Sequence, residues 1–163
     1  MIETFNSTPS TPSALGLQVP DFTVPATGGD FTLSAHIGKP VVLYFYPKDN
    51  TPGCTTQAQQ FRDLHAEFVK SGCVVLGVSR DSLKSHEGFK AKLGLPFDLI
   101  SDIEGVLCRM FDVVKNKMLY GKKVLGIERS TFLIDAHGVL RQEWRATKAD
   151  GNAATVLEAV RKL

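Results

Sequence analysis

The sequence predicts an α/β fold in which a central mixed β-sheet is flanked by helices. Three observations support this prediction. The continuous apolar run Val41–Tyr46 has the length and composition of a strand buried on both faces. Apolar residues then recur at helical spacing, at Ala58, Phe61, Leu64 and Phe68, before a second apolar run at 73–78. Strand, helix and strand in this order form a βαβ unit, whose two strands are parallel.

The remaining elements follow from shorter patterns. Phe22, Val24, Phe31 and Leu33 alternate with polar residues around Gly28-Gly29, which predicts an N-terminal β-hairpin. We expect helices at 82–93 and 103–111, a strand at 97–100, a hairpin over 131–144, and a loop with some strand at 112–128. We expect Asp150 to cap a last helix, whose inner face is formed by Ala154, Leu157 and Val160 or Val156.

Length and composition indicate one globular domain. The chain has 163 residues, of which 43% are hydrophobic and 22% charged. We expect residues 1–13, rich in Ser, Thr and Pro, to form a flexible arm and residues 14–163 to form the domain. A net charge of +2 does not favour nucleic-acid binding, and no apolar run approaches the length of a membrane span. Three scattered cysteines and an N-terminus without a signal-like apolar core favour a cytoplasmic location.

Cys54 is the most informative residue. It follows a predicted buried strand, whose carboxyl end is where open α/β sheets bind ligands. Thr51 and Pro52 are favourable residues for the N-cap and first position of a helix, so Cys54 falls in the first turn, and Gly53 removes bulk beside the sulfur. Low-pKa thiols favour such positions. The alternative is a small buried apolar residue, which the preceding Pro-Gly turn does not favour.

A helix terminus alone does not account for full activation of a thiol. A free thiol has a pKa near 8.5, and lowering a thiol pKa to about 6 requires about 3.4 kcal/mol of preference for the anion. A helix terminus contributes at most about 2 kcal/mol. The sequence therefore predicts a cation, most suitably an arginine, brought from elsewhere in the fold.

The pattern Pro47-x-x-x-Thr51-x-x-Cys54 resembles the peroxidatic-cysteine motif of the peroxiredoxins. The longer string Tyr44–Thr55 is similar to the bacterioferritin comigratory protein, or peroxiredoxin Q, subfamily. Arg129, in the stretch 129–135, matches the arginine-containing strand of that family. Arg129 is thus the expected cation.

The resemblance implies a thioredoxin-like fold and reduction of hydrogen peroxide and organic hydroperoxides at Cys54. In that case Arg129 bonds both sulfur and peroxide, the Thr51 hydroxyl bonds the peroxide, and Pro47 shields the pocket from water. Capping of the helix by the same Thr51 hydroxyl would compete with substrate binding. The resemblance further implies a monomer and a reductant that is thioredoxin, glutaredoxin or a small thiol. We expect no cofactor and no metal.

The thiol that resolves the Cys54 sulfenic acid is an open question in the sequence. Many members of the subfamily carry a second cysteine five residues on, where this chain has Gln59, and others carry it in the helix predicted at 82–93, which here has none. We expect Cys73 to pack in the core. The sequence therefore favours a one-cysteine cycle resolved by an external thiol, with a Cys54–Cys108 disulfide as the alternative.

Other features have simpler interpretations. Gln57 replaces an acid that is common in the family. We expect the lysines of 115–123 to be solvated, or to help dock an acidic reductant. The four histidines share no metal-ligand spacing, which favours surface or helix-face roles. A thiol–disulfide oxidoreductase would need Cys-x-x-Cys, but Thr51 occupies the partner position, and the intact Cys54 motif does not favour a non-enzymatic binding module.

Overall fold

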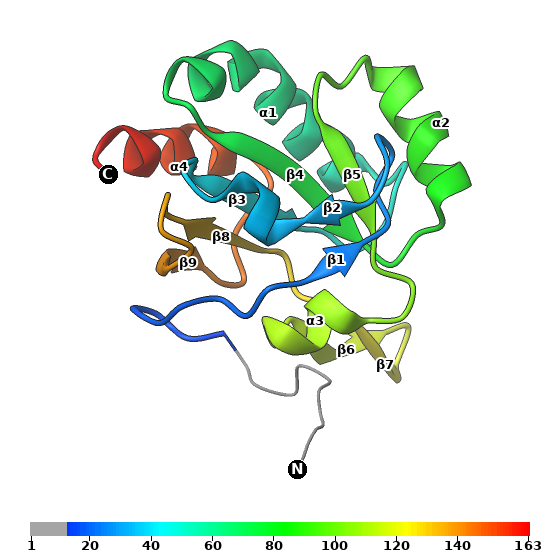
Figure 1. Ribbon diagram of the computed structural model, residues 1–163. Coiled ribbons are helices and arrows are strands. Elements are labelled where there is room, and N and C mark those ends of the chain that lie inside the picture. Colours follow the sequence, from blue (N-terminus) through cyan, green and yellow to red (C-terminus); the bar gives the residue numbers. More distant parts are fainter. Residues whose placement is uncertain (1–12) are drawn as a thin grey trace.

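The computed structural model describes residues 13–163, so the predicted arm at 1–13 lies outside it except for Ser13. The central sheet has five strands in the order β5-β4-β3-β8-β9 (Figure 1). Their bounds are Val41–Phe45 for β3, Val74–Ser79 for β4, Asp98–Ser101 for β5, Ser130–Ile134 for β8 and Leu140–Trp144 for β9. β3, β4 and β5 are parallel to one another, whereas β8 is antiparallel to both β3 and β9. The predicted mixed sheet is confirmed.

Helices cover one face of the sheet. They are α1 (Pro52–Lys70), α2 (Leu83–Leu93) and α4 (Asn152–Arg161). One strand residue in two points toward them, because side chains alternate along a strand. Val42, Tyr44 and Tyr46 therefore pack with Phe61 and Phe68 of α1 in one hydrophobic cluster. The predicted βαβ unit corresponds to β3, α1 and β4.

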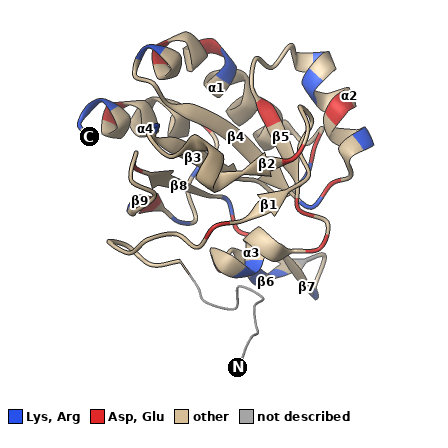
Figure 2. Cartoon of the chain, in the orientation of Figure 1, with Lys and Arg blue, Asp and Glu red and all other residues tan. Residues whose placement is uncertain are grey.

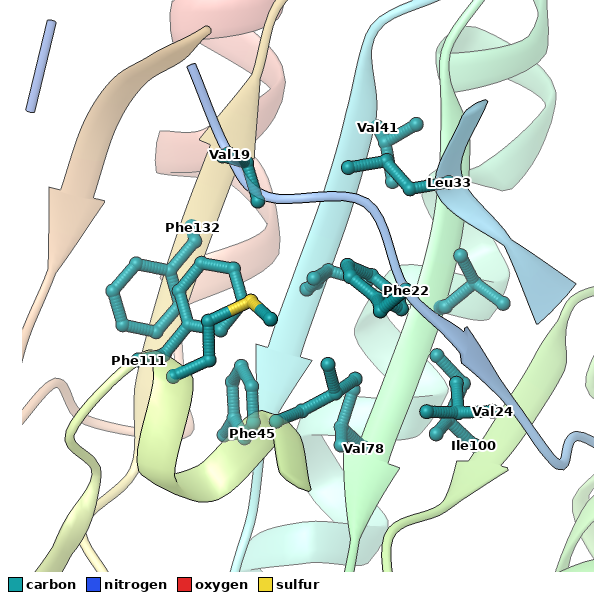
Figure 3. Close-up of a cluster of buried hydrophobic side chains, with 14 of the residues drawn as sticks. Val19, Phe22, Val24, Leu33, Val41, Phe45, Val78, Ile100, Phe111 and Phe132 are labelled. Atoms are coloured by element: carbon teal, nitrogen blue, oxygen red, sulfur yellow. The ribbon is translucent and has the colours of Figure 1, made fainter. Parts of the chain in front are cut away.

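The opposite face is covered by the N-terminal hairpin and a short helix. The hairpin pairs β1 (Thr23–Val24) with β2 (Phe31–Thr32), as predicted, and the 3-10 helix η2 (Leu33–His36) follows it. Helix α3 (Val106–Met110) begins after Gly105. Figure 3 shows Phe45 of β3, Phe132 of β8 and Phe111, which follows α3, on one side of this cluster, with Phe22 and Val24 of the N-terminal segment on the other.

Two of the expectations from sequence need correction. Residues 112–128 form more strand than loop, since β6 (Val114–Leu119) and β7 (Lys122–Ile127) pair along their whole length. The N-cap of α4 is Gly151, not Asp150, because φ of 85° at this position suits glycine. Asp150 instead accepts a hydrogen bond from Gln60. The shifted start buries Ala153, Val156, Leu157 and Val160 and leaves Ala154 exposed.

Candidate active site

The carboxyl end of β3 brings Cys54 and Arg129 together. The loop 46–51 leads from β3 into α1, and Cys54 occupies the first turn of that helix. Because β8 runs antiparallel to β3, its first residue, Ser130, pairs with Phe45, the last residue of β3. Arg129, which precedes Ser130, therefore lies at the same end of the sheet as the loop that leads from β3 to Cys54. Two residues 75 positions apart in sequence become neighbours.

The predicted cation stands beside the sulfur. Cys54 is buried, with 2% of its surface exposed, and Nη2 of Arg129 lies 3.5 Å from its Sγ, within hydrogen-bond reach for sulfur. The first turn of a helix also presents unpaired N–H groups and the positive end of the helix dipole. Both stabilise a thiolate more than a neutral thiol, which is the electrostatic requirement that the sequence indicated.

Gly53 permits this approach. A Cβ atom at position 53 would lie 3.1 Å from Nη2 of Arg129, closer than ordinary van der Waals contact. The sequence indicated that Gly53 removes bulk beside the sulfur. In the structure the guanidinium group of Arg129 lies where a side chain at position 53 would be, so glycine at this position leaves room for the cation beside the sulfur.

A buried chain of amides orients Arg129. Its Nη1 donates to Oε1 of Gln57 at 2.6 Å, and Nε2 of Gln57 donates to Oδ1 of Asn152 at 2.9 Å. The same Asn152 oxygen accepts from the Thr131 hydroxyl at 2.8 Å. Asn152 thus fixes which end of the Gln57 amide faces the guanidinium. Gln57 offers a neutral acceptor, so no carboxylate at this position competes with the sulfur for the charge of Arg129.

Thr51 occupies the N-cap position of α1, as predicted, but its side chain forms no capping hydrogen bond. Its hydroxyl donates instead to the backbone carbonyl of Lys48 at 2.8 Å. The competition between capping and substrate binding is therefore absent. With its hydrogen committed to Lys48, the hydroxyl oxygen of Thr51 still has lone pairs that can accept a hydrogen bond. Pro47 lies half-buried in the same loop.

A buried ion pair anchors this loop to α2. Oδ2 of Asp49 lies 2.7 Å from Nδ1 of His86, and both side chains are almost fully buried. The other ring nitrogen of His86, Nε2, lies 2.9 Å from the carbonyl oxygen of Ile100. Both ring nitrogens of His86 thus lie within hydrogen-bond distance of an acceptor oxygen. His86 lies on a helix face, as expected, but its burial and its contact with Asp49 were not predicted.

Asp49 also accepts hydrogen bonds from the hydroxyls of Tyr46 at 2.6 Å and Ser85 at 2.8 Å. Burial alone would raise the pKa of the Asp49 carboxyl, but the hydrogen bonds from His86, Tyr46 and Ser85 outweigh it and lower this pKa below its usual value. The loop that carries Pro47 and Thr51 is consequently held by a charged group with three donors.

The same region contains the His/Asp cluster closest to a metal-ligand arrangement among residues 13–163. Ligand atoms of Asp49, Asp81 and His86 lie within 4.8 Å of one another. Each of these groups already has partners, since Asp81 accepts from the Ser79 hydroxyl and from the backbone N–H of Asp49. The cluster is therefore a hydrogen-bonded support for the loop, and the expectation that the protein uses no metal remains a prediction.

The other two cysteines have environments unlike that of Cys54. Cys73 packs in the cluster on the helical face, and burial raises the pKa of its thiol to about 12. Cys108 lies in the cluster on the opposite face of the sheet. Burial, and after it the neighbouring carboxylate of Asp102, raise the pKa of the Cys108 thiol well above its usual value. Both thiols are therefore held in the unreactive neutral form.

Comparison with known proteins decides the family. The profile of the AhpC/TSA family matches residues 15–143. The chain belongs to the AhpC/TSA family. Peroxiredoxin Bcp of Xanthomonas campestris is 51% identical over 154 residues, which cover 93% of this chain and 96% of the relative. Peroxiredoxin Bcp of Bacillus subtilis is 47% identical over 150 residues, covering 91% and 96% of the two chains.

Solved structures agree. Peroxiredoxin Q of Xanthomonas campestris superposes with a TM-score of 0.82 at 53% identity, covering 86% of this chain and 90% of that one. A mutant of Xylella fastidiosa PrxQ superposes with a TM-score of 0.87 at 41% identity, covering 93% and 98%. The resemblance drawn from the Cys54 motif and the thioredoxin-like fold are both confirmed. The protein is a peroxiredoxin, a thiol-dependent peroxidase that acts on peroxides and uses thiol reductants.

Proposed function

We propose that the protein reduces hydrogen peroxide and organic hydroperoxides by a one-cysteine cycle, with Cys54 as the peroxidatic residue and an external thiol as the resolving partner. The observation that supports Cys54 most strongly is the 3.5 Å contact between its sulfur and Arg129 at the start of a helix. The Xanthomonas campestris bacterioferritin comigratory protein, which is 52% identical with a TM-score of 0.82, has alkyl peroxide reduction activity and has been solved as a trapped intermediate/ligand complex. That likeness supports organic hydroperoxides as substrates.

The first step is displacement at oxygen. The Cys54 thiolate attacks one peroxide oxygen, the O–O bond breaks, and the other oxygen leaves as hydroxide or alkoxide and takes up a proton. Cys54 becomes a sulfenic acid. Negative charge moves from sulfur to the leaving oxygen, so a cation that reaches both atoms stabilises the transition state. The contacts of Arg129 support this role, because one of its nitrogens faces Cys54 while the other donates to Gln57.

Thr51 and Pro47 complete the proposed site. The Thr51 hydroxyl accepts the O–H of the incoming peroxide, because its own hydrogen is directed to Lys48. This interaction orients the peroxide for attack and distinguishes a hydroperoxide from a dialkyl peroxide, which has no hydrogen to donate. Pro47 limits access of water to the sulfur from the loop side.

Two equivalents of an external thiol return the enzyme to its resting state. The first thiol attacks the Cys54 sulfenic acid, water leaves, and a mixed disulfide forms. The second thiol attacks that disulfide and releases Cys54 as thiol with an oxidised thiol pair. Thioredoxin, glutaredoxin or a small thiol fits this chemistry.

The environments of the remaining cysteines support this cycle over a Cys54–Cys108 disulfide. Cys54 and Cys108 belong to hydrophobic clusters on opposite faces of the sheet, so pairing them requires local rearrangement of at least one of these clusters. The neutral state of the Cys108 thiol further slows its attack on a sulfenic acid.

Mass spectrometry after one equivalent of peroxide tests the cycle. We expect a gain of one oxygen on the Cys54 peptide, loss of peroxide consumption in Cys54→Ser, and retained consumption with dithiothreitol in Cys73→Ser and Cys108→Ser. Full activity in Cys54→Ser would refute the assignment of the peroxidatic residue. Loss of two hydrogens with a linked peptide of Cys54 and Cys108 would instead establish the two-cysteine cycle.

We further propose that residues 14–163 act as one monomeric domain in the cytoplasm. All three cysteines are free thiols, which suits a reducing compartment. Within residues 13–163, no helix is long and apolar enough to cross a bilayer. Light scattering at micromolar concentration tests the monomer.

A further inference from the structure

The β6–β7 hairpin carries an apolar strip that continues from the core into solvent. Residues Val114 and Ile127 pair at its base and pack against the core. Side chains two positions along a strand share a face. The same face therefore continues outward through Leu125 and then Met118. These two side chains are 67% and 66% exposed, so the part of the strip beyond the core faces solvent.

The turn of the hairpin places an aromatic residue at the outer end. Tyr120 and Gly121 both adopt positive φ, 52° and 77°, as in the tight turns that favour Asn-Gly. Positive φ is unfavourable for a bulky residue. Tyr120 nevertheless occupies the position, with 96% of its surface exposed. Tyrosine and methionine are enriched at protein interfaces. A contact between Tyr120 and a binding partner would explain why the chain keeps this unfavourable backbone conformation.

Lysines surround this strip, and the hairpin itself contains no acidic residue. The hairpin contains Lys115, Lys117, Lys122 and Lys123 and has no Asp or Glu between 113 and 127, as the colouring of β6 and β7 in Figure 2 reflects. Among the described residues, Lys115 alone of these four contacts a carboxylate, that of Asp112. Pairing of two copies through this hairpin would bring like charges together, so the surface suits an acidic partner.

The hairpin is linked directly to the candidate active site. Strand β7 ends at Ile127, two residues before Arg129. At about 3.3 Å per residue, even Lys122 lies within about 23 Å of Arg129 along the chain. A standard interface covers about 800 Å² on each partner, which corresponds to a patch about 30 Å across. One bound protein can therefore cover both the hairpin and the carboxyl end of β3, where Cys54 and Arg129 lie.

We propose that the β6–β7 hairpin is the docking surface for an acidic protein reductant of the thioredoxin type. The proposal rests on the one-cysteine cycle above, in which an external thiol must reach the buried sulfur of Cys54. Tyr120, Met118 and Leu125 form the contact centre, and the lysines attract the acidic rim of the partner and orient it. Small thiols need no such surface, because they reach the pocket by diffusion alone.

Charge reversal of the hairpin tests the proposal. The triple variant Lys117→Glu, Lys122→Glu, Lys123→Glu is compared with a control of equal charge change at three exposed lysines elsewhere, Lys39→Glu, Lys84→Glu, Lys162→Glu. Peroxide turnover is measured with an acidic bacterial thioredoxin and its reductase, with a glutaredoxin system, and with dithiothreitol. We expect kcat/KM for the protein reductant to fall about tenfold or more at low salt in the hairpin variant alone. The dithiothreitol rate should be unchanged.

A second variant, Tyr120→Ala, isolates the apolar contact. We expect it to raise KM for the protein reductant severalfold and to leave the salt dependence intact, because the lysines remain. Equal protein-reductant kinetics in both triple variants would overturn the proposal, as would wild-type enzyme that accepts only small thiols. Association of copies that Tyr120→Ala abolishes, or binding to anionic phosphatidylglycerol vesicles with unchanged reductant kinetics, would assign the surface to another partner. Failure of the proposed function is separate, because loss of peroxide reduction at Cys54 would abolish the dithiothreitol reaction as well. A two-cysteine cycle would instead appear as the linked peptide of Cys54 and Cys108, with the dithiothreitol reaction retained.

Discussion

Substitution of Asp49 by asparagine removes the charge that holds the active-site loop. The carboxylate accepts from Tyr46, Ser85 and His86 at 2.6 to 2.8 Å. An amide has one acceptor oxygen, so its NH2 group must face at least one of these donors, and His86 loses the carboxylate beside its ring. Removing one partner of a buried ion pair costs about 3–5 kcal/mol. For a chain of this length we expect a fall in Tm of roughly 6 to 20 °C.

Urea unfolding followed by far-ultraviolet circular dichroism measures this loss. Asp63→Asn is the matched control, because Asp63 is 65% exposed and its ion pair with Arg62 contributes about 0–1 kcal/mol. The lowered pKa of Asp49 sets the pH dependence. Its contribution to stability is present above the unfolded pKa near 3.9 and is lost as pH falls through the folded pKa. The wild type and Asp49→Asn should therefore converge in acid.

Two results would refute this reasoning. One is a difference in unfolding free energy below about 1 kcal/mol at pH 7, which would mean that the pair is not a net support. The other is a difference that stays constant between pH 7 and about 3, because the charged carboxylate would then not be its source.

Three further predictions concern single side chains. Gly53→Ala should lower the rate constant for peroxide about tenfold in stopped flow without lowering Tm, because its Cβ displaces Arg129 while alanine favours a helix. Gln57→Leu should cost about 1–3 kcal/mol in unfolding free energy and slow peroxide reduction, since Arg129 and Asn152 lose a buried partner, whereas Gln59→Leu should change neither. Stability should fall with rising pH from about 9 to about 12, where the Cys73 thiol ionises only in the unfolded chain, and Cys73→Ala should reduce that slope by up to about 1.36 kcal/mol per pH unit in urea titrations.

The βαβ core was predictable because each of its elements has an unambiguous pattern. The run that became β3 is too short for a buried helix and has no polar interruption, and α1 has both a start signal and an apolar face. The need for an arginine beside Cys54 followed from the free energy required to ionise a thiol. The pairing of Phe45 with Ser130, which brings Arg129 close to Cys54, is a tertiary contact that the sequence does not reveal.

Other features depend on contacts that local sequence does not encode. The strands β6 and β7 were not predicted, because their lysines interrupt the alternation of apolar and polar residues that marks a strand. The interruption is tolerated because the apolar face of this hairpin is only partly buried. Asp150 has the side chain of a good cap, but Gly151 alone tolerates the backbone angle at the start of α4. Asp49, His86 and Asn152 were missed as members of the site. Each is polar at a position where its burial and its partners come from elements distant in sequence.

The division of the interior by the central sheet has a chemical consequence. Phe45, Phe111 and Phe132 lock together on the face away from Cys54, with ring centroids 4.7 to 5.5 Å apart. Cys54 belongs to the cluster on the helical face, so none of these three rings packs in the layer that holds the reactive sulfur. The central sheet therefore separates the layer in which the sulfur changes its chemical state from an aromatic cluster that takes no part in the reaction.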